Sequence, residues 1–271
     1  MANLDGVGVK LCRAKGLVSE LRLMIEPLAL EATRSIVGAA SPTDPSTLIY
    51  RATRVPPIDP MAAAIAGDIV HNLRSALDHL AWQLVLLDNG QPNEDTSFPL
   101  HESATNRNGN PRVLTIAPGI RDSAIMTAVE AMQPFAEAQY GHNPRTDSLS
   151  IIRRLNNIDK HRLLLTVVHA LDRDLPAYWG ADDGDPKPRI SFNLGALSTN
   201  AVVATFDFDG ATPPAHFEPH LKLAVTIGEP DADWGAGLDI IDVLDRLRRS
   251  VAREINIHIA PLMSEPPLPW D

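Results

Sequence analysis

Apolar residues recur at helical spacing through most of the first 171 residues and again near the C-terminus. Recurrence at intervals of three and four residues gives a helix one apolar face that can pack into a core. Start and stop signals frame the second helix, with Asp59-Pro60 at its beginning and Asn89-Gly90 at its end, and Thr146-Asp147 offers an N-cap for the fourth helix. The predicted helices cover residues 9–37, where Pro27 favours an interruption, 60–88, 121–138, 148–171 and 238–259.

Strand-like segments are concentrated between the fourth and the last helix. Runs rich in β-branched and aromatic residues predict strands over residues 47–55, 189–194, 201–208 and 220–227. The last two alternate apolar and polar residues, as expected for an antiparallel sheet with one face in water. Residues 91–118 read as a long surface connection, in which Phe98-Pro99-Leu100 is the expected anchor.

This order of elements indicates an α+β fold, with a helical bundle core and a small segregated antiparallel β-sheet. We predict a single domain over residues 1–271. Its helical core covers about residues 8–171 together with the C-terminal helix 238–259, and its β-rich segment covers about residues 189–228.

Composition limits the class of protein and the cellular compartment that we expect. The chain has 271 residues and 44 % hydrophobic residues, enough for a substantial core. The single cysteine, Cys12, excludes an intramolecular disulfide framework and fits a reducing compartment. No apolar run reaches the roughly 20 residues that a membrane span needs, and the N-terminus lacks the order of a signal peptide. We expect a soluble cytoplasmic protein with no membrane partner.

The formal net charge of −10 argues against a wide phosphate-binding surface, and no DNA partner is expected. Two local basic clusters remain, and for the second a solvated helix face balanced by nearby acids is favoured. The first cluster consists of Arg153, Arg154, Lys160 and Arg162, and the second of Arg246, Arg248, Arg249 and Arg253.

The second helix carries an unusual polar stripe. Its apolar face is formed by Ile65, Ile69, Leu73, Leu77, Leu80, Leu84 and Leu87. The opposite side carries Asp68, Asn72, Ser75 and His79, flanked by His71 and Trp82. A stripe of neutral donors, an acid and histidines, where Lys and Glu would be usual, suits a partly buried hydrogen-bond network or a ligand.

The fourth helix carries a matching set. Arg154 and His161 are seven residues apart, on one side of a continuous helix, with Asn157 between them. His161 could act as a general acid or base, and Arg154 could hold a phosphate or a carboxylate. If the two helices face one another, they build a polar pocket, and the alternative is a hydrogen-bonded interhelix network without chemistry.

Other chemistries have weaker support. His71 and His79 are about 12 Å apart along a helix, too far to share one metal ion. A site that combines His79, Asp68 or Asp78 and His161 is the basis of a third hypothesis, a metal-dependent hydrolase. No Gly-rich phosphate loop and no nucleophile elbow are present, so neither a cofactor nor a resident metal is expected.

Two blocks, HNLRSALDHLAW at residues 71–82 and NNIDKHRLLL at residues 156–165, resemble a family of bacterial and phage proteins that has no established reaction. More distantly, Arg74 to His79 and Arg154 to His161 look like the Arg-x4-6-His motif of HEPN domains. In a continuous helix Arg74 and His79 lie about 140° apart, whereas Arg154 and His161 share a face.

The HEPN resemblance implies a small helical domain that forms homodimers and, in many members, cuts RNA without a metal. The Arg and His would position and protonate groups around the scissile phosphate, and the RNA 2′-hydroxyl would be the nucleophile. The leading hypothesis is thus a HEPN-like, metal-independent ribonuclease or related phosphate-directed activity. Its catalytic residues would be His161, Arg154, Asn157 and His79, and its ligand-binding residues His71, Asn72, Ser75, Asp68 and Arg74. The alternative is a non-catalytic binding or interaction protein whose pocket is structural or holds a small ligand.

Overall fold

The computed structural model describes residues 2–112, 114–164, 166–170, 178–179, 185–193, 195–228 and 238–269. Residues 171 and 194, in the predicted fourth helix and the predicted strand 189–194, lie outside these ranges. The fold is α+β, as predicted, and the chain divides into two compact units. A helical unit comprises Met1–Glu20, Ala64–Leu164 and Leu244–Asp271, and a β unit comprises Leu21–Ala63 and Leu165–Val243.

The helices are α1 Asp5–Arg34, α2 Pro60–Leu87, α3 Ser123–Ala131, α4 Ser148–Asp159, α5 Ile240–His258 and α6 Ala260–Met263, with 3-10 turns η1 Pro134–Tyr140 and η2 Pro144–Thr146. The strands are β1 Ile36–Ala40, β2 Thr47–Ala52, β3 Thr166–Ala170, β4 Tyr178–Trp179, β5 Arg189–Phe192, β6 Val202–Asp207, β7 Glu218–Pro219 and β8 Leu223–Ile227. No helix in the described ranges is both long and apolar enough to cross a membrane.

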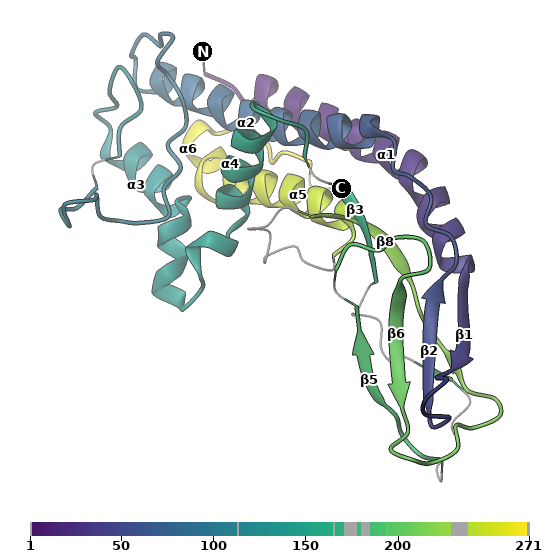
Figure 1. The fold of residues 1–271 in the computed structure, drawn as a ribbon. Coiled ribbons are helices and arrows are strands. Elements are labelled where there is room, and N and C mark those ends of the chain that lie inside the picture. Colours follow the sequence, from purple (N-terminus) through teal and green to yellow (C-terminus); the bar gives the residue numbers. More distant parts are fainter. Residues whose placement is uncertain are drawn as a thin grey trace. The chain divides into compact units, whose positions relative to one another are not determined.

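In the helical unit, the first half of α1 runs antiparallel to α2 (Figure 1). The Asn3 backbone N–H donates to Gln83 Oε1 at 3.0 Å, and the His79 ring lies directly over Gly6. The apolar face predicted for α2 is the centre of this core. Its buried members are Ile65, Ile69, Leu73, Leu77, Leu80 and Leu84, and α4 and α5 add Leu149, Ile152, Leu155, Leu247, Val251 and Ile255. Burial of this apolar face is what holds the helices together.

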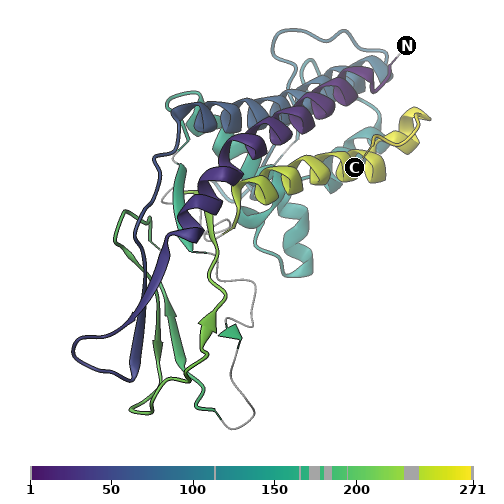
Figure 2. The same ribbon diagram turned by 90° about the vertical axis from the view of Figure 1, so that its right-hand side faces the viewer.

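The β unit is built on a four-stranded antiparallel sheet with the order β1-β2-β6-β5, which is labelled in Figure 1 and turned by 90° in Figure 2. Two further antiparallel pairs join β3 to β8 and β4 to β7. The Phe217 ring packs edge-on against Phe206 and Phe208, with centroids 5.0 and 5.1 Å apart. Edge-to-face aromatic pairs of this kind stabilise a core beyond the area that they bury.

Several predicted boundaries are wrong. The first helix continues through Pro27 to Arg34, and β1 follows where the helix was expected to run on to residue 37. The fourth helix ends at Asp159, and residues 166–170 form β3. There the apolar, β-branched run pairs with β8 from Thr166↔Ile227 to Ala170↔Leu223. A short apolar run fits a strand as well as a helix, so its periodicity alone misled the prediction.

Candidate functional site

Helices α2 and α4 face one another, which the sequence left open. A Cβ atom added to Gly67 would clash with Asp159 Oδ1, so the carboxylate occupies the space of a missing side chain. Burial raises the pKa of the Asp159 carboxyl, and the neighbouring Asp68 raises it further, while His71 lowers it. The start of α2 and the end of α4 therefore meet through a close polar contact.

A clamp on α2 fixes the connection that follows it. Arg74 binds Asp78 through two hydrogen bonds, Nε to Oδ2 at 3.2 Å and Nη2 to Oδ1 at 2.7 Å. Arg74 Nη2 also donates to the Phe98 carbonyl at 2.8 Å, and the Phe98 N–H donates to Asp78 Oδ1 at 3.0 Å. The Phe98 side chain is buried. The predicted role of Phe98 as an anchor of residues 91–118 is confirmed.

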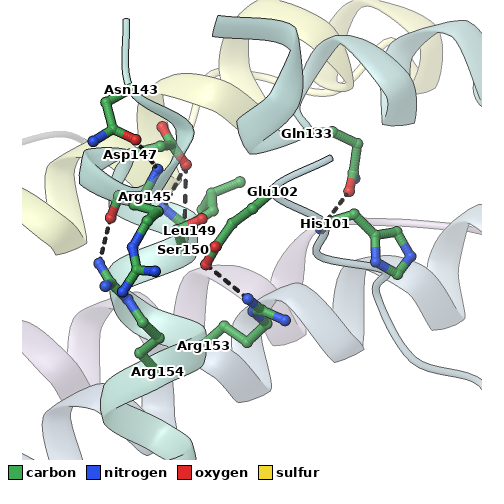
Figure 3. A network of polar contacts seen from close by, with 10 residues as sticks. All are labelled: His101, Glu102, Gln133, Asn143, Arg145, Asp147, Leu149, Ser150, Arg153 and Arg154. Carbon is green, nitrogen blue, oxygen red and sulfur yellow. Dashed lines mark hydrogen bonds and ion pairs between the residues drawn. The ribbon is translucent and has the colours of Figure 1, made fainter. Parts of the chain in front are cut away.

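Gln133, which is buried, holds the next residues of the connection (Figure 3). Its Nε2 donates to the Pro99 carbonyl at 2.9 Å and to the Val129 carbonyl at 3.1 Å. Its Oε1 accepts a hydrogen bond from the His101 backbone N–H at 3.1 Å. Every polar group of this amide is therefore used to position the backbone.

The N-terminus of α4 is capped as the sequence predicted. Asp147 accepts hydrogen bonds from the backbone N–H groups of Leu149 and Ser150 at 2.9 and 3.4 Å (Figure 3). Burial raises the pKa of this carboxyl, although the same N–H donors lower it. The cap fixes the start of α4 and thereby the direction in which its arginines project.

The two arginines in the middle of α4 reach partners outside their own helix (Figure 3). Arg153 Nη2 binds Glu102 Oε1 at 2.7 Å, and Arg154 donates to the carbonyl of Arg145 in η2. His101, next to Glu102, has its pKa lowered by burial and by the cations Arg112 and Arg153. An imidazole in this position is neutral at pH 7 and can accept a proton.

Between these elements lies a cavity of about 530 Å³, here called the basic cavity. Its lining residues are Arg74, Phe98, Leu100, Arg153, Arg154, Asn156, Asn157 and Lys160. Four of these side chains are cationic, and none of the lining residues is acidic. Arg74 and Arg153 are ion-paired with Asp78 and Glu102, whereas Lys160 is exposed and has no ion-pair partner among the described residues. The cavity wall therefore favours an anionic ligand.

Asn156 is the most informative residue of the basic cavity. Only 6 % of the residue is exposed, and within the described ranges no side chain or backbone group bonds to its amide. The amide atoms are not among the fully buried side-chain atoms without a partner, so the small exposed part of this residue opens onto the cavity. Buried polar groups are almost always hydrogen-bonded, to protein, to water or to a ligand. An amide of this kind on a cavity wall offers two N–H donors and a carbonyl to whatever occupies the cavity.

The predicted site residues divide between the basic cavity and other places. Arg154, Asn157 and Arg74 line the basic cavity, as a pocket between the two helices requires. His161 does not line it, because α4 ends at Asp159 and His161 is exposed in the turn that follows. His79 lines a different cavity on the next turns of α2. Because α2 is continuous, Arg74 and His79 point in directions about 140° apart and line different cavities, as the helical spacing predicted.

The remaining predicted residues lie elsewhere on α2. Asp68 and His71 are exposed and interact with Asp159, and Asn72 Nδ2 donates to the Asp68 carbonyl of its own helix at 2.8 Å. Ser75 is half-buried and lines neither cavity. Asn156 was not among the predicted site residues, whereas Arg153 and Lys160 belong to the first predicted basic cluster. A sequence signal for Asn156 is its position one residue after Leu155 and four residues after Ile152, both of which are buried on α4.

Compared with protein-family models, with curated proteins and with solved structures, the chain gives no match. Within the described ranges, no three His, Cys, Asp or Glu side chains gather in a group that could hold a metal ion.

Proposed function

We propose that the basic cavity binds phosphate groups of single-stranded RNA. The observation that carries the proposal is the amide of Asn156, a residue only 6 % exposed, which opens onto a cavity lined by four cations and no acid. An Asn amide can donate hydrogen bonds to phosphate oxygens, and Arg and Lys side chains supply the charge that these oxygens require.

Local charge makes such a site compatible with an acidic chain. The net charge of −10 weakens any extended nucleic-acid surface, but the basic cavity concentrates its cations on one short helix and its surroundings. Phosphate affinity depends on the few cations that reach the ligand rather than on the whole chain. A short strand with few phosphate contacts is therefore the ligand that fits.

Cleavage of the bound strand is a second candidate function, favoured by the position of one residue. His161 directly follows Lys160, which lines the basic cavity. Among the exposed histidines, His161 is therefore the closest in sequence to a residue that lines this cavity. In a metal-independent reaction, a base would take the proton of the 2′-hydroxyl, and the resulting oxygen would attack phosphorus. The bond to the 5′-oxygen would break, and an acid would protonate the leaving oxygen. His101, which is neutral at pH 7, is the alternative base.

Binding is tested with a fluorescent octauridylate in EDTA, monitored by anisotropy. Asn156→Leu keeps the side-chain volume and removes the hydrogen bonds, and we expect it to raise Kd about tenfold or more. Lys160→Met should do the same, whereas the matched control Arg246→Met removes an exposed cation of the second basic cluster and should leave Kd within about twofold. Unchanged Kd in a folded Asn156→Leu variant would refute the proposal.

Cleavage is followed by gel analysis of the same RNA and of its deoxy counterpart. Loss of the RNA, but not of the DNA, in EDTA and its abolition by His161→Ala would support the ribonuclease candidate. Binding without cleavage in every sample would exclude it and leave the binding function standing. Formation of a homodimer stays a prediction from the sequence, to be checked by light scattering.

A further inference from the structure

A second cavity, of about 430 Å³, lies beside the clamp on the following turns of α2. Its lining residues are Asp78, His79, Trp82, Gln83 and Thr96, and it is here called the Trp82 cavity. Trp82 is 43 % exposed, which is unusual for the largest apolar side chain in proteins. An exposed aromatic face on a cavity wall is a surface on which a planar ligand can stack.

Some polar groups of the Trp82 cavity already form hydrogen bonds within the described part of the chain, and others do not. Asp78 is engaged by Arg74 and Phe98, and the Thr96 hydroxyl donates to the Ala117 carbonyl at 2.8 Å. Gln83 Oε1 accepts from Asn3, which leaves the Gln83 Nε2 donor.

The His79 ring and the Trp82 indole N–H also have no hydrogen-bond partner among the residues that the structure describes. A Cβ atom on Gly6 would lie 2.6 Å from His79 Nδ1, so contact with α1 holds this ring in place. An aromatic face together with a few donors and acceptors at its edge is the chemistry that recognises a nucleobase.

We propose that the Trp82 cavity binds a nucleobase of the RNA strand whose phosphate occupies the basic cavity. Trp82 stacks on the base, and His79 and Gln83 contact its edge. This inference rests on the proposed function, and it adds a base-binding subsite and a minimum ligand length.

The clamp joins the two subsites. Arg74 lines the basic cavity and its partner Asp78 lines the Trp82 cavity, while Phe98 and Thr96 of the same connection line one cavity each. Arg74 and Trp82 are eight residues apart in a continuous helix, which is about 12 Å along its axis. Stacked nucleotides advance by about 3.4 Å per step, so a ligand of roughly four nucleotides reaches both subsites.

The length dependence of binding is the first measurement. Uridylates of one, two, four and eight nucleotides should bind with rising affinity up to about four, and the longer strand should gain little more. The same series bound to Trp82→Leu should lose most of the gain between two and four nucleotides. A Trp82→Phe variant retains an aromatic face and should recover much of the wild-type affinity.

A double-mutant cycle between protein and ligand makes the test specific. Trp82→Leu is expected to weaken octauridylate binding by about tenfold, as is an abasic octamer with wild-type protein. If the base stacks on Trp82, the two changes together should weaken binding little more than either alone. Equal affinities of wild type and Trp82→Leu for octauridylate, or strictly additive losses, would overturn the inference.

Inorganic phosphate separates this inference from the function on which it rests. The phosphate concentration needed for competition should be unaffected by Trp82→Leu and raised about tenfold or more by Asn156→Leu. Wild-type protein that binds phosphate and RNA independently of Trp82 would contradict the base subsite alone. Wild-type protein that binds neither ligand would contradict both proposals.

Discussion

Helices α4 and α5 each carry a basic cluster, but they use their cations differently. On α5, Asp245 binds two arginines of the same helix, Arg248 at 2.8 Å and Arg249 at 3.1 Å, and the Arg248 side chain is only 4 % exposed. On α4, Arg153 reaches Glu102 on another segment, and Lys160 is exposed at the wall of a cavity. Arg248 and Arg249 of α5 are thus paired within their own helix, whereas Arg153 and the C-cap residue Lys160 of α4 line a cavity that can hold a ligand.

The largest expected effect concerns the internal pair of α5. Asp245→Ala leaves the buried Arg248 guanidinium without this carboxylate, and we expect a loss of about 2–3 kcal/mol in the free energy of unfolding. Glu102→Ala, the matched change on the partner of Arg153, should cost below about 1 kcal/mol, because that pair is more exposed. Urea unfolding of both variants measures the difference. Equal losses would remove the distinction between the two helices.

The contact of α4 with Gly67 comes next. Gly67→Ala places a methyl group where the Asp159 carboxylate lies, and we expect a loss of about 1–2 kcal/mol in the free energy of unfolding. In an Asp159→Ala background the space is open, and the same substitution should stabilise by up to about 1 kcal/mol, since Ala favours a helix over Gly. Failure of the sign to reverse would show that this contact does not position α4.

The cap of α4 gives a smaller effect with a defined pH dependence. Asp147→Ala removes the cap and should cost about 1 kcal/mol, whereas Asp147→Asn keeps it. Burial raises the pKa of Asp147 above its ordinary value of 3.8. A raised pKa in the folded protein stabilises on the acidic side, and this contribution is lost as the pH rises through the folded-state pKa.

The Asn variant cannot lose that contribution. Its unfolding free energy, relative to wild type, should therefore increase as the pH rises from about 3.8 through the folded-state pKa of Asp147. Thermal unfolding of the two proteins across this range measures the difference. A constant difference would mean that the Asp147 carboxyl has the same pKa in the folded and unfolded chains.

The smallest expected effect on stability is that of Lys160, the exposed cation on the wall of the basic cavity. Lys160→Met should change the unfolding free energy by less than about 0.5 kcal/mol. It should nevertheless reduce the slope of log Kd against log salt for octauridylate by about 0.7, the value of one phosphate contact on a single strand. An unchanged slope would place Lys160 outside the binding site.

Local signals predicted several parts of the molecule correctly. The apolar face of α2, the Asp147 cap and the Phe98 anchor are each encoded within a few residues, and the structure confirms all three. The end of α4 was missed because the run after Lys160 becomes strand β3 only by pairing with β8, far along the chain. The choice between Asn156 and Asn157 likewise depends on the direction in which the partner helix lies.

The clamp of Arg74 and Asp78 recognises Phe98 by its main chain. Its two hydrogen bonds go to the carbonyl and the N–H of one residue, as a neighbouring strand would supply them. At this point the path of residues 91–118 therefore depends on main-chain hydrogen bonds as well as on the buried Phe98 side chain. A protein engineer can exchange the exposed Ser97 beside Phe98 while the clamp keeps the supporting backbone in place.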